Sequence, residues 1–494
     1  MAFEVLAVAS EMHPLVKTGG LADVVGALPG ALAPEGVRVR TLLPGYPAVM
    51  AALKRPRVAA EIPGLFGGAA RVLAARHAGT ELLVLEASHL FDRPGGPYQG
   101  PGGAEWGDNA QRFAALGRAA ATMAERLGVD AVHAHDWQAG LAPAFLRFAP
   151  RRIPCLFSIH NMAFQGRFPA AVFGGLGLPA EAWSREGVEY YGGVGFLKAG
   201  VWFADAISTV SPSYAEEILT PEGGMGLEGL LRGRVGVLHG ILNGLDTTEW
   251  DPAADAHLAA RYTAEDVAPR ALNKAAVQER FGLTPDPAAP LFAFVGRLAW
   301  QKGVELLLEA GPALMEARAQ LALLGSGEAA LERACRDFAA AHPGRAGVFI
   351  GFDEGVARRV YGGADCVVVP SRFEPCGLTQ LAALRYGAPP VVARTGGLAD
   401  TVIDANPVAM AAGCATGVQV TPGRADALAA GLRRALALLR NGAAWRGMQA
   451  RAMATDVSWR PSARRYAALL RAIAGRGAAV PVGAEETQGK DCAP

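Results

Sequence analysis

Short apolar segments with the length of β-strands alternate with longer helical patterns along almost the whole chain. This alternation predicts parallel sheets covered by helices, because a long connection must carry the chain back before the next parallel strand can start. The expected strands span residues 3–10, 37–43, 81–87, 130–135, 153–160 and 206–210 in the first half, and 291–296, 320–325, 347–351, 365–370 and 388–393 in the second. Each half has enough strands for its own doubly wound sheet. The sequence therefore predicts an α/β fold with two Rossmann-like domains.

The length of the chain also favours two large domains, since 494 residues exceed what one hydrophobic core commonly supports. A last strand at residues 235–241 precedes a polar, proline-containing stretch, so we expect an N-terminal domain over 1–241 and a C-terminal domain over 242–457. A helix at 458–475 is expected to pack back on the N-terminal domain. Residues 476–494 show no period and are expected to form a disordered tail.

Composition and charge exclude several classes of partner. The 47 basic and 46 acidic residues give a formal net charge of +1, which offers no extended attraction to nucleic acid. Gly, Pro and charged residues interrupt every apolar run before the roughly 20 residues that a membrane-spanning helix needs. The six cysteines are scattered without a metal-ligand spacing, and the first residues resemble no targeting segment. We expect a cytoplasmic protein without nucleic-acid or membrane partners.

One seven-residue pattern occurs in each half of the chain. Residues 17–23 read K-T-G-G-L-A-D and residues 394–400 read R-T-G-G-L-A-D. Each copy follows a strand or its loop and opens a helix, where backbone N–H groups and the helix dipole favour an anion. A glycine-rich corner is the purely structural alternative for either copy alone. The cation and the repetition favour phosphate or sugar binding between two domains.

Charged side chains follow two expected strands of the second half. Arg297 and Lys302 lie at the carboxyl edge of the sheet, where open α/β sheets bind ligands, and together suit a diphosphate. Glu374 precedes Pro375 and Gly377 at another helix start, where a carboxylate can accept hydrogen bonds from sugar hydroxyls. The alternatives at these two places are a solvated helix start and an acidic helix cap.

Histidines and an aspartate end two expected strands of the first half, with H-A-H-D-W at 133–137 and S-I-H-N at 158–161. A metal site is one alternative, but adjacent side chains at a strand end point to opposite faces, and no Asp-x-Asp stands at a strand end. Asp136, Trp137 and His160 fit a carbohydrate site better, because an indole face packs on a sugar ring while polar groups bind its hydroxyls.

Taken together, four strings resemble the bacterial glycogen synthases and plant starch synthases. They are S-E-M-H-P-L-V-K-T-G-G-L-A-D-V-V-G-A-L-P from residue 10, H-A-H-D-W at 133, G-R-L-A-W-Q-K-G at 296 and P-S-R-F-E-P-C-G-L-T-Q-L at 370. The resemblance implies the GT-B fold, two Rossmann-like domains facing across a deep cleft that closes. It also implies glucose transfer with retention from ADP-glucose to the non-reducing end of an α-1,4-glucan, glycogen or a maltooligosaccharide. We expect no cofactor, and because no Asp-x-Asp stands at a strand end, we expect Arg297 and Lys302 to stand in for a divalent metal.

The resemblance also assigns roles to individual residues. It implies catalytic roles for Glu374, Arg297, Lys302, His160 and Asp136, donor binding by Lys17, Gly19, Gly20, Asn243, Phe352, Cys376, Gly377, Leu378 and Thr379, and acceptor binding by Tyr98 and Trp137. Family members commonly carry tyrosine where Phe352 stands, so here only the ring face is available to adenine. Ala382 stands where sucrose- and lipopolysaccharide-type transferases often have a second glutamate, which agrees with the glycogen synthase pattern.

Two other functions remain open from the sequence. One is a different nucleotide-sugar enzyme of similar architecture, such as an epimerase, which would not need a glucan. The other is a non-catalytic glucan-binding or regulatory protein that keeps the fold. The presence of Lys17, Arg297, Lys302 and Glu374 argues against a site that has lost its catalytic residues.

Overall fold

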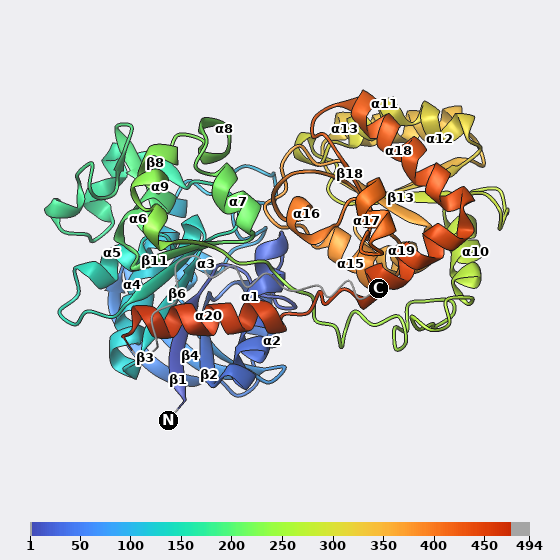
Figure 1. Cartoon of the computed structure of the whole chain (residues 1–494). Coiled ribbons are helices and arrows are strands. Elements are labelled where there is room, and N and C mark those ends of the chain that lie inside the picture. The colour runs from blue at the N-terminus through green and yellow to red at the C-terminus, as the bar shows by residue number, and fades with distance from the viewer. Residues whose placement is uncertain (1, 476–494) are drawn as a thin grey trace. The chain divides into compact units, whose positions relative to one another are not determined.

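The computed structural model describes residues 2–475, which form two compact units (Figure 1). Among these residues, unit 1 comprises 2–243 and 459–475, and unit 2 comprises 244–458. Each unit contains one large sheet with helices on its faces. The α/β class and the two Rossmann-like units predicted from the sequence are confirmed. The tail predicted for 476–494 lies outside the described residues.

Unit 1 is built on a nine-stranded sheet in the order β12-β11-β7-β6-β1-β2-β5-β4-β3. The parallel strands are β1 (Phe3–Val8), β2 (Val37–Pro44), β5 (Thr80–Glu86), β6 (Ala131–His135), β7 (Cys155–Ile159), β11 (Ala206–Thr209) and β12 (Leu238–Gly240). Numbered along the chain, these strands have the order 3-2-1-4-5-6-7, so the chain changes direction between β1 and β6. Ligands of open α/β sheets bind at the carboxyl ends of strands at such a switch point.

One edge of this sheet differs from the prediction, because β3 (Arg57–Leu65) and β4 (Gly68–His77) add an antiparallel hairpin. The pairing of β3 has two register shifts, and much of that strand is exposed, so its sequence lacks the continuous apolar run of the central strands. The strand expected at 235–241 is shorter than predicted, since Val235–Val237 forms a 3₁₀ turn before β12. A separate short sheet contains β8 (Arg167–Pro169), β10 (Gly193–Gly195) and β9 (Glu189–Tyr190).

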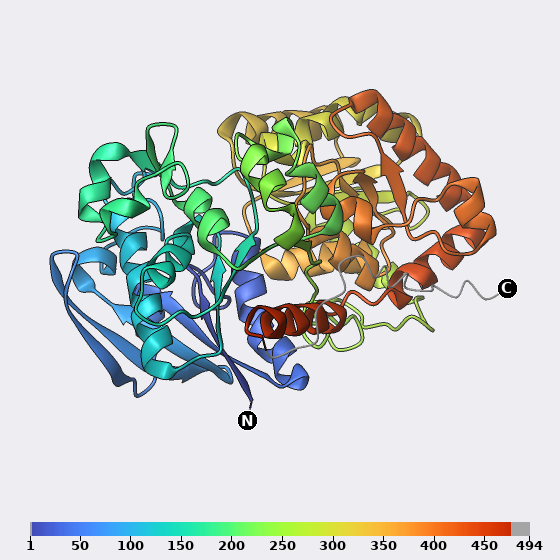
Figure 2. The same cartoon turned by 60° about the vertical axis from the view of Figure 1, so that its left-hand side comes forward.

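The last described helix, α20 (Arg460–Ile473), belongs to unit 1 and packs beside α1 (Gly20–Leu32) (Figures 1 and 2). Tyr466 and Leu470 on α20 join a buried apolar cluster with Val24 and Leu28 of α1. The other helices of the unit are α2 (Pro47–Ala52), α3 (Ser88–Phe91), α4 (Asn109–Leu127), α5 (Ala142–Arg147), α6 (Phe196–Phe203), α7 (Pro212–Glu217), α8 (Pro221–Gly224) and α9 (Glu228–Gly233).

Unit 2 is built on six parallel strands in the order β15-β14-β13-β16-β17-β18, which is 3-2-1-4-5-6 along the chain. They are β13 (Leu291–Val295), β14 (Gln320–Gly325), β15 (Ala346–Ile350), β16 (Cys366–Val369), β17 (Val391–Ala393) and β18 (Val418–Val420). The strand β18 was not predicted. The switch point of this sheet lies between β13 and β16, which are hydrogen-bonded neighbours.

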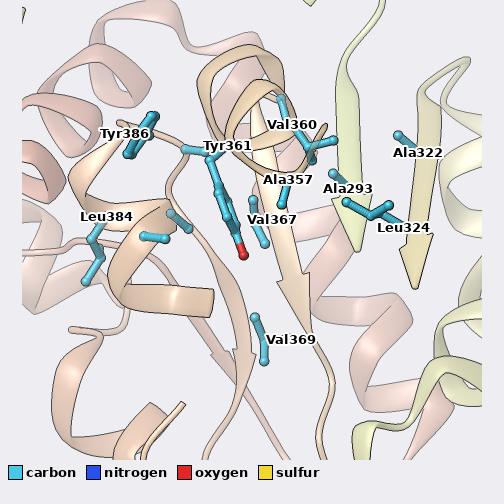
Figure 3. Packing of buried hydrophobic residues seen from close by; sticks show 14 of the residues in the cluster. Ala293, Ala322, Leu324, Ala357, Val360, Tyr361, Val367, Val369, Leu384 and Tyr386 are labelled. Atoms are coloured by element: carbon cyan, nitrogen blue, oxygen red, sulfur yellow. The ribbon is translucent and has the colours of Figure 1, made fainter. Parts of the chain in front are cut away.

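Both faces of the unit 2 sheet are buried, because alternate side chains along a strand enter two different apolar clusters. Ala293 and Leu324 pack on one face with Tyr361 of α14 (Glu354–Gly363) and with Tyr386 (Figure 3). Phe292 and Leu323, for example, pack on the other face. The remaining helices are α10 (Arg270–Arg280), α11 (Val304–Ala310), α12 (Pro312–Glu316), α13 (Ala329–Ala341), α15 (Thr379–Arg385), α16 (Gly396–Thr401), α17 (Pro407–Ala411), α18 (Ala425–Arg440) and α19 (Gly442–Ala454).

Within residues 2–475, no helix has the length and apolar character needed to cross a bilayer.

Candidate functional site

In unit 1, three buried polar residues follow the ends of neighbouring strands at the switch point. Glu11 follows β1, Asp136 follows β6 and His160 follows β7. Carboxyl ends of adjacent parallel strands meet at one edge of the sheet, so these side chains come together although they are far apart in the sequence. Asp136 and His160 were predicted as site residues, whereas Glu11 was missed. The signal that could have found Glu11 is its place directly after the first strand.

Asp136 organises the loop that carries His160. Its Oδ1 accepts a hydrogen bond from the backbone N–H of His160 at 2.7 Å, and its backbone has a positive φ of 56°, which is costly for a residue other than glycine. Burial raises the pKa of the Asp136 carboxyl to about 7, although the N–H groups of His160 and Asn161 act in the opposite direction. The carboxyl group therefore fixes backbone at the site and can change its charge near neutral pH.

The histidines at this edge form a buried network of neutral rings. His135 Nδ1 lies 3.0 Å from His160 Nε2, and His133 Nε2 lies 2.7 Å from the Ser158 hydroxyl. Burial lowers the pKa of His160 to about 4 and that of His133 to about 3, so both are uncharged at neutral pH. Within the described residues, no three histidine, cysteine or carboxylate side chains are grouped as ligands of a metal ion.

The loop at residues 17–20 carries the first copy of the repeat. The Lys17 ammonium is exposed and forms an ion pair with Asp23 at 2.6 Å. Gly19 is the N-cap of α1 and has no side chain that could cap the helix. A Cβ atom built on Gly19 or Gly20 would meet no atom within 4 Å, so the backbone here is open to a ligand. These features fit the predicted donor loop.

Tyr98 and Trp137 lie next to each other in an aromatic cluster, with ring centroids 6.2 Å apart. The edge of Phe113 meets Trp137 at 4.9 Å, and a Cβ on Gly166 would lie 2.4 Å from the indole, so the ring is held firmly in place. The Tyr98 hydroxyl lies 2.7 Å from the Ser10 hydroxyl and also bonds Glu11. Tyr98 and Trp137, the two residues predicted to bind the acceptor, therefore lie at the same edge of the sheet as Glu11 and Asp136.

Unit 2 places Arg297 and Glu374 on the two sides of its switch point, after β13 and β16. Lys302 Nζ lies 2.5 Å from Glu374 Oε2, and the Ser371 hydroxyl donates to the same oxygen at 2.9 Å. The Glu374 side chain is only 7% exposed. Arg297 is exposed and donates to the Gln301 amide oxygen at 3.4 Å. The site thus has one cation held by a carboxylate and a second that faces solvent.

The second copy of the repeat supports the Glu374 loop. The Gly397 N–H donates to the carbonyl oxygens of Glu374 and Pro375 at 3.1 Å each. Gly396 has a φ of 43°, and a Cβ there would lie 2.1 Å from the Glu374 carbonyl oxygen. The glycines of this copy pack against the backbone of the site, which favours the structural alternative of a glycine-rich corner.

The other predicted donor residues occupy several environments. Cys376 is buried, Gly377 has a φ of 76°, and the Thr379 hydroxyl donates to the Val295 carbonyl at 3.4 Å, next to Leu378. Phe352 lies in the loop after β15 and is 76% exposed, as a stacking platform requires. Asn243 ends unit 1, and its buried Oδ1 has no hydrogen-bond partner within residues 2–475.

Two protein-family models match the chain. The starch synthase catalytic domain model matches residues 4–233, and the model for glycosyl transferases group 1 matches residues 278–443. These two segments contain the switch-point residues of unit 1 and unit 2, respectively.

Comparisons with individual proteins agree with these models. The chain is 59% identical over 477 residues to glycogen synthase of Acidiphilium cryptum, covering 96% of this chain and all of that protein. It is 54% identical to glycogen synthase of Rhodopseudomonas palustris strain HaA2, covering 96% and 99%. The solved catalytic domain of starch synthase IV from Arabidopsis thaliana, bound to ADP and acarbose, has a TM-score of 0.87 at 29% identity, with 96% and 100% covered. The chain therefore belongs to the glycogen synthase family.

Proposed function

We propose that this protein transfers glucose from ADP-glucose to the non-reducing 4-hydroxyl of an α-1,4-glucan, with retention of configuration. The observation that carries the proposal is the pair of cations at the unit 2 switch point, where Arg297 faces solvent and Lys302 is held beside Glu374. A nucleoside diphosphate is the ligand that such a pair suits. Family membership supports the proposal, as does the related starch synthase that was solved with ADP and acarbose.

The proposed reaction is a front-face displacement. The bond between the anomeric carbon of glucose and the diphosphate oxygen breaks, and a bond to the acceptor oxygen forms on the same face of the sugar. The hydroxyl proton passes to the departing diphosphate. Arg297 and Lys302 stabilise the negative charge that grows on the diphosphate, a contribution of about 3 kcal/mol for one well-placed donor.

His160 serves this reaction as a neutral group. Because burial lowers its pKa to about 4, the imidazole ring is neutral at pH 7 and does not act as a general acid in the imidazolium form. The neutral ring can form a hydrogen bond with a glucose hydroxyl. Asp136 holds the backbone of His160 in place. Their proposed roles are contact with the transferred sugar for His160 and support of that contact for Asp136.

The remaining assignments follow the two substrates. The donor is bound by Lys17, Gly19, Gly20, Asn243 and residues 376–379. The exposed ring of Phe352 stacks on its adenine. Tyr98 and Trp137 bind the glucan, whose sugar rings present apolar faces to aromatic side chains. A cytoplasmic location is part of the proposal, and the five cysteines of the described residues are free thiols, as a reducing compartment favours.

A radiolabel experiment tests the proposal. The purified protein is incubated with glycogen and with ADP-glucose or UDP-glucose labelled in the sugar, and both nucleotide release and label in the polymer are measured. We expect ADP release to match incorporation into glycogen. Label that leaves the nucleotide sugar only as a rearranged small sugar supports an epimerase. Binding to glycogen without nucleotide release supports a non-catalytic glucan-binding protein.

A further inference from the structure

Glu11 is a buried carboxylate at the unit 1 switch point that the proposed reaction does not yet use. It follows β1, and its residue is only 2% exposed. An ionised carboxylate is costly to bury unless hydrogen bonds satisfy its oxygens. Its bonding partners therefore indicate what this residue does.

Four donors from two separate segments converge on this carboxylate. Oε2 accepts from the backbone N–H of Thr18 and, at 3.4 Å, from that of Gly19. Oε1 accepts from the Thr18 hydroxyl at 2.6 Å and from the Tyr98 hydroxyl. Within residues 2–475, no lysine, arginine or histidine forms an ion pair with Glu11. Neutral donors surround the carboxylate, so its contacts fix positions and do not neutralise a cation.

On one side, Glu11 holds the turn that leads into α1. The N-cap is Gly19, which has no side chain to accept from the first N–H groups of the helix. The carboxylate of Glu11 binds the N–H groups just before the helix, where the helix dipole also favours a negative charge. This contact places the turn that carries Lys17 and the open backbone of Gly20.

On the other side, Glu11 holds the acceptor-side tyrosine. The Tyr98 hydroxyl is shared between Glu11 and the Ser10 hydroxyl, which lies 2.7 Å away. The Tyr98 ring in turn lies beside Trp137. One carboxylate therefore contacts both the donor loop and the aromatic cluster.

We propose that Glu11 is a positioning residue that holds the donor loop at residues 17–20 and Tyr98 in one fixed arrangement, so that donor and acceptor are aligned together. This inference rests on the proposed function, in which the loop at residues 17–20 contacts ADP-glucose and Tyr98 contacts the glucan. With 2% of its surface exposed, Glu11 acts through Thr18, Gly19 and Tyr98.

Substitutions separate this role from a contact with substrate. Glu11→Ala leaves two N–H groups and two hydroxyls without their acceptor, and we expect kcat/KM to fall at least tenfold with higher KM values for both ADP-glucose and glycogen. Glu11→Gln is expected to retain activity within about twofold, because its oxygen can accept from the N–H groups while its NH₂ group donates to the hydroxyls. Thr18→Val should raise mainly the KM for ADP-glucose, and Tyr98→Phe mainly that for glycogen.

A control accounts for loss of stability. Leu83→Ala removes a buried side chain of β5 and should lower the melting temperature without changing either KM. Glu11→Asp, which shortens the side chain by one methylene, provides the same test if Glu11→Ala does not fold. Wild-type KM values in the Ala or Asp variant would overturn the inference, and so would equal losses in the Gln and Ala variants.

Failure of the inference can be told apart from failure of the proposed function. A wild-type protein that transfers no glucose overturns the function. The amide hydrogen exchange of Thr18 and Gly19 still tests Glu11 in that case, because we expect slow exchange in the wild type and in Glu11→Gln, and fast exchange in Glu11→Ala. Fast exchange of these amides in the wild type would contradict the role proposed for Glu11.

Discussion

Arg297 and Lys302 differ in how they can meet a diphosphate. Lys302 is engaged by Glu374 at 2.5 Å, whereas Arg297 is exposed and bonds the uncharged side chain of Gln301. A diphosphate can therefore bind the guanidinium without breaking an ion pair, while Lys302 must be shared between the ligand and Glu374. Arg297 is the cation whose removal has the simpler interpretation.

We predict that Arg297→Ala lowers kcat/KM for ADP-glucose by about 10²- to 10³-fold, since one preorganised charge on the leaving diphosphate is lost. Steady-state kinetics with glycogen in excess measures this effect. Arg336→Ala is the matched control, because that side chain lies exposed on α13 and pairs with Glu332 in its own helix. A loss below about threefold in Arg297→Ala would place Arg297 outside the donor site.

The buried histidines predict how stability depends on pH. The folded-state pKa of His160 is about 4, below its usual value of 6.5, so the unfolded chain binds a proton between these values while the folded chain does not. Stability from this group is complete above pH 6.5 and is lost as the pH falls towards 4, by about 2 kcal/mol between pH 7 and pH 5. The slope for Asp136 is opposite, since its pKa is raised to about 7 and its ionisation favours unfolding as the pH rises.

Urea unfolding of the wild type and His160→Asn at pH 7 and pH 5 measures the contribution of the histidine. We expect the wild type to lose more stability on acidification than the variant, by about 2 kcal/mol. Equal losses in both proteins would mean that His160 is accessible to protons in the folded state. The comparison between the two proteins removes the effect of all other groups that titrate in this range.

Residue identities at the site were predictable, but their pairings were not. Arg297, Lys302 and Glu374 stand in recognisable strings, yet the Lys302–Glu374 pair joins residues that are 72 positions apart. Glu11 and Tyr98 are 87 positions apart. Such contacts cannot be predicted from the spacing of residues within one segment, because the order of strands in the sheet brings the segments together.

The two copies of the repeat begin two helices in different environments. Before α1, the glycines of the first copy face open space, whereas the glycines of the second copy, at the start of α16, press on the backbone around Glu374. The same string therefore has an open turn in unit 1 and a packed turn in unit 2. Sequence alone could not distinguish them, since burial depends on the neighbouring loop.

Alanine at matched positions of the two copies tests this difference. Gly396→Ala should lower the melting temperature and the activity together, because its φ is 43° and a Cβ would lie 2.1 Å from the Glu374 carbonyl oxygen. Gly20→Ala should keep the melting temperature and raise the KM for ADP-glucose, because only a bound ligand would meet the new methyl group. Differential scanning fluorimetry and kinetics of both variants measure the two effects. A stable, active Gly396→Ala would refute the supporting role of the second copy.

Prediction of the strands succeeded where both faces are buried. The central strands of each sheet read as continuous apolar runs and were found close to their observed bounds, as for β13 and β14. The hairpin β3–β4 was missed because it lies at a sheet edge and much of β3 is exposed, which removes the apolar run. Edge strands depend on their pairing partner more than on their own residues.

At the scale of the whole molecule, the first six parallel strands of each unit lie in the same order, 3-2-1-4-5-6. Both units place polar side chains at their switch points. The alternation of strands and helices already limits the fold to a few topologies, because connections between parallel strands are short and right-handed as a rule. The pairing of side chains at each edge depends on the folded arrangement and is not encoded in any local string.

We predict that glucose transfer needs no divalent metal, because Arg297 and Lys302 supply the positive charge that a metal would bring to the diphosphate. The purified enzyme is treated with EDTA, desalted and assayed with ADP-glucose and glycogen. We expect most of the activity to remain. Complete loss that is restored by Mg²⁺ or Mn²⁺ would show that these two cations do not suffice.

The place of α20 has a consequence for biosynthesis. Tyr466 and Leu470 complete a cluster with α1, although more than 400 residues separate the two helices along the chain. The ribosome therefore finishes the contiguous unit 2, residues 244–458, before it releases the segment that covers Val24 and Leu28. During translation the apolar surface of α1 stays exposed until α20 is synthesised. We therefore expect chaperones to retain a nascent chain that is stalled before residue 459.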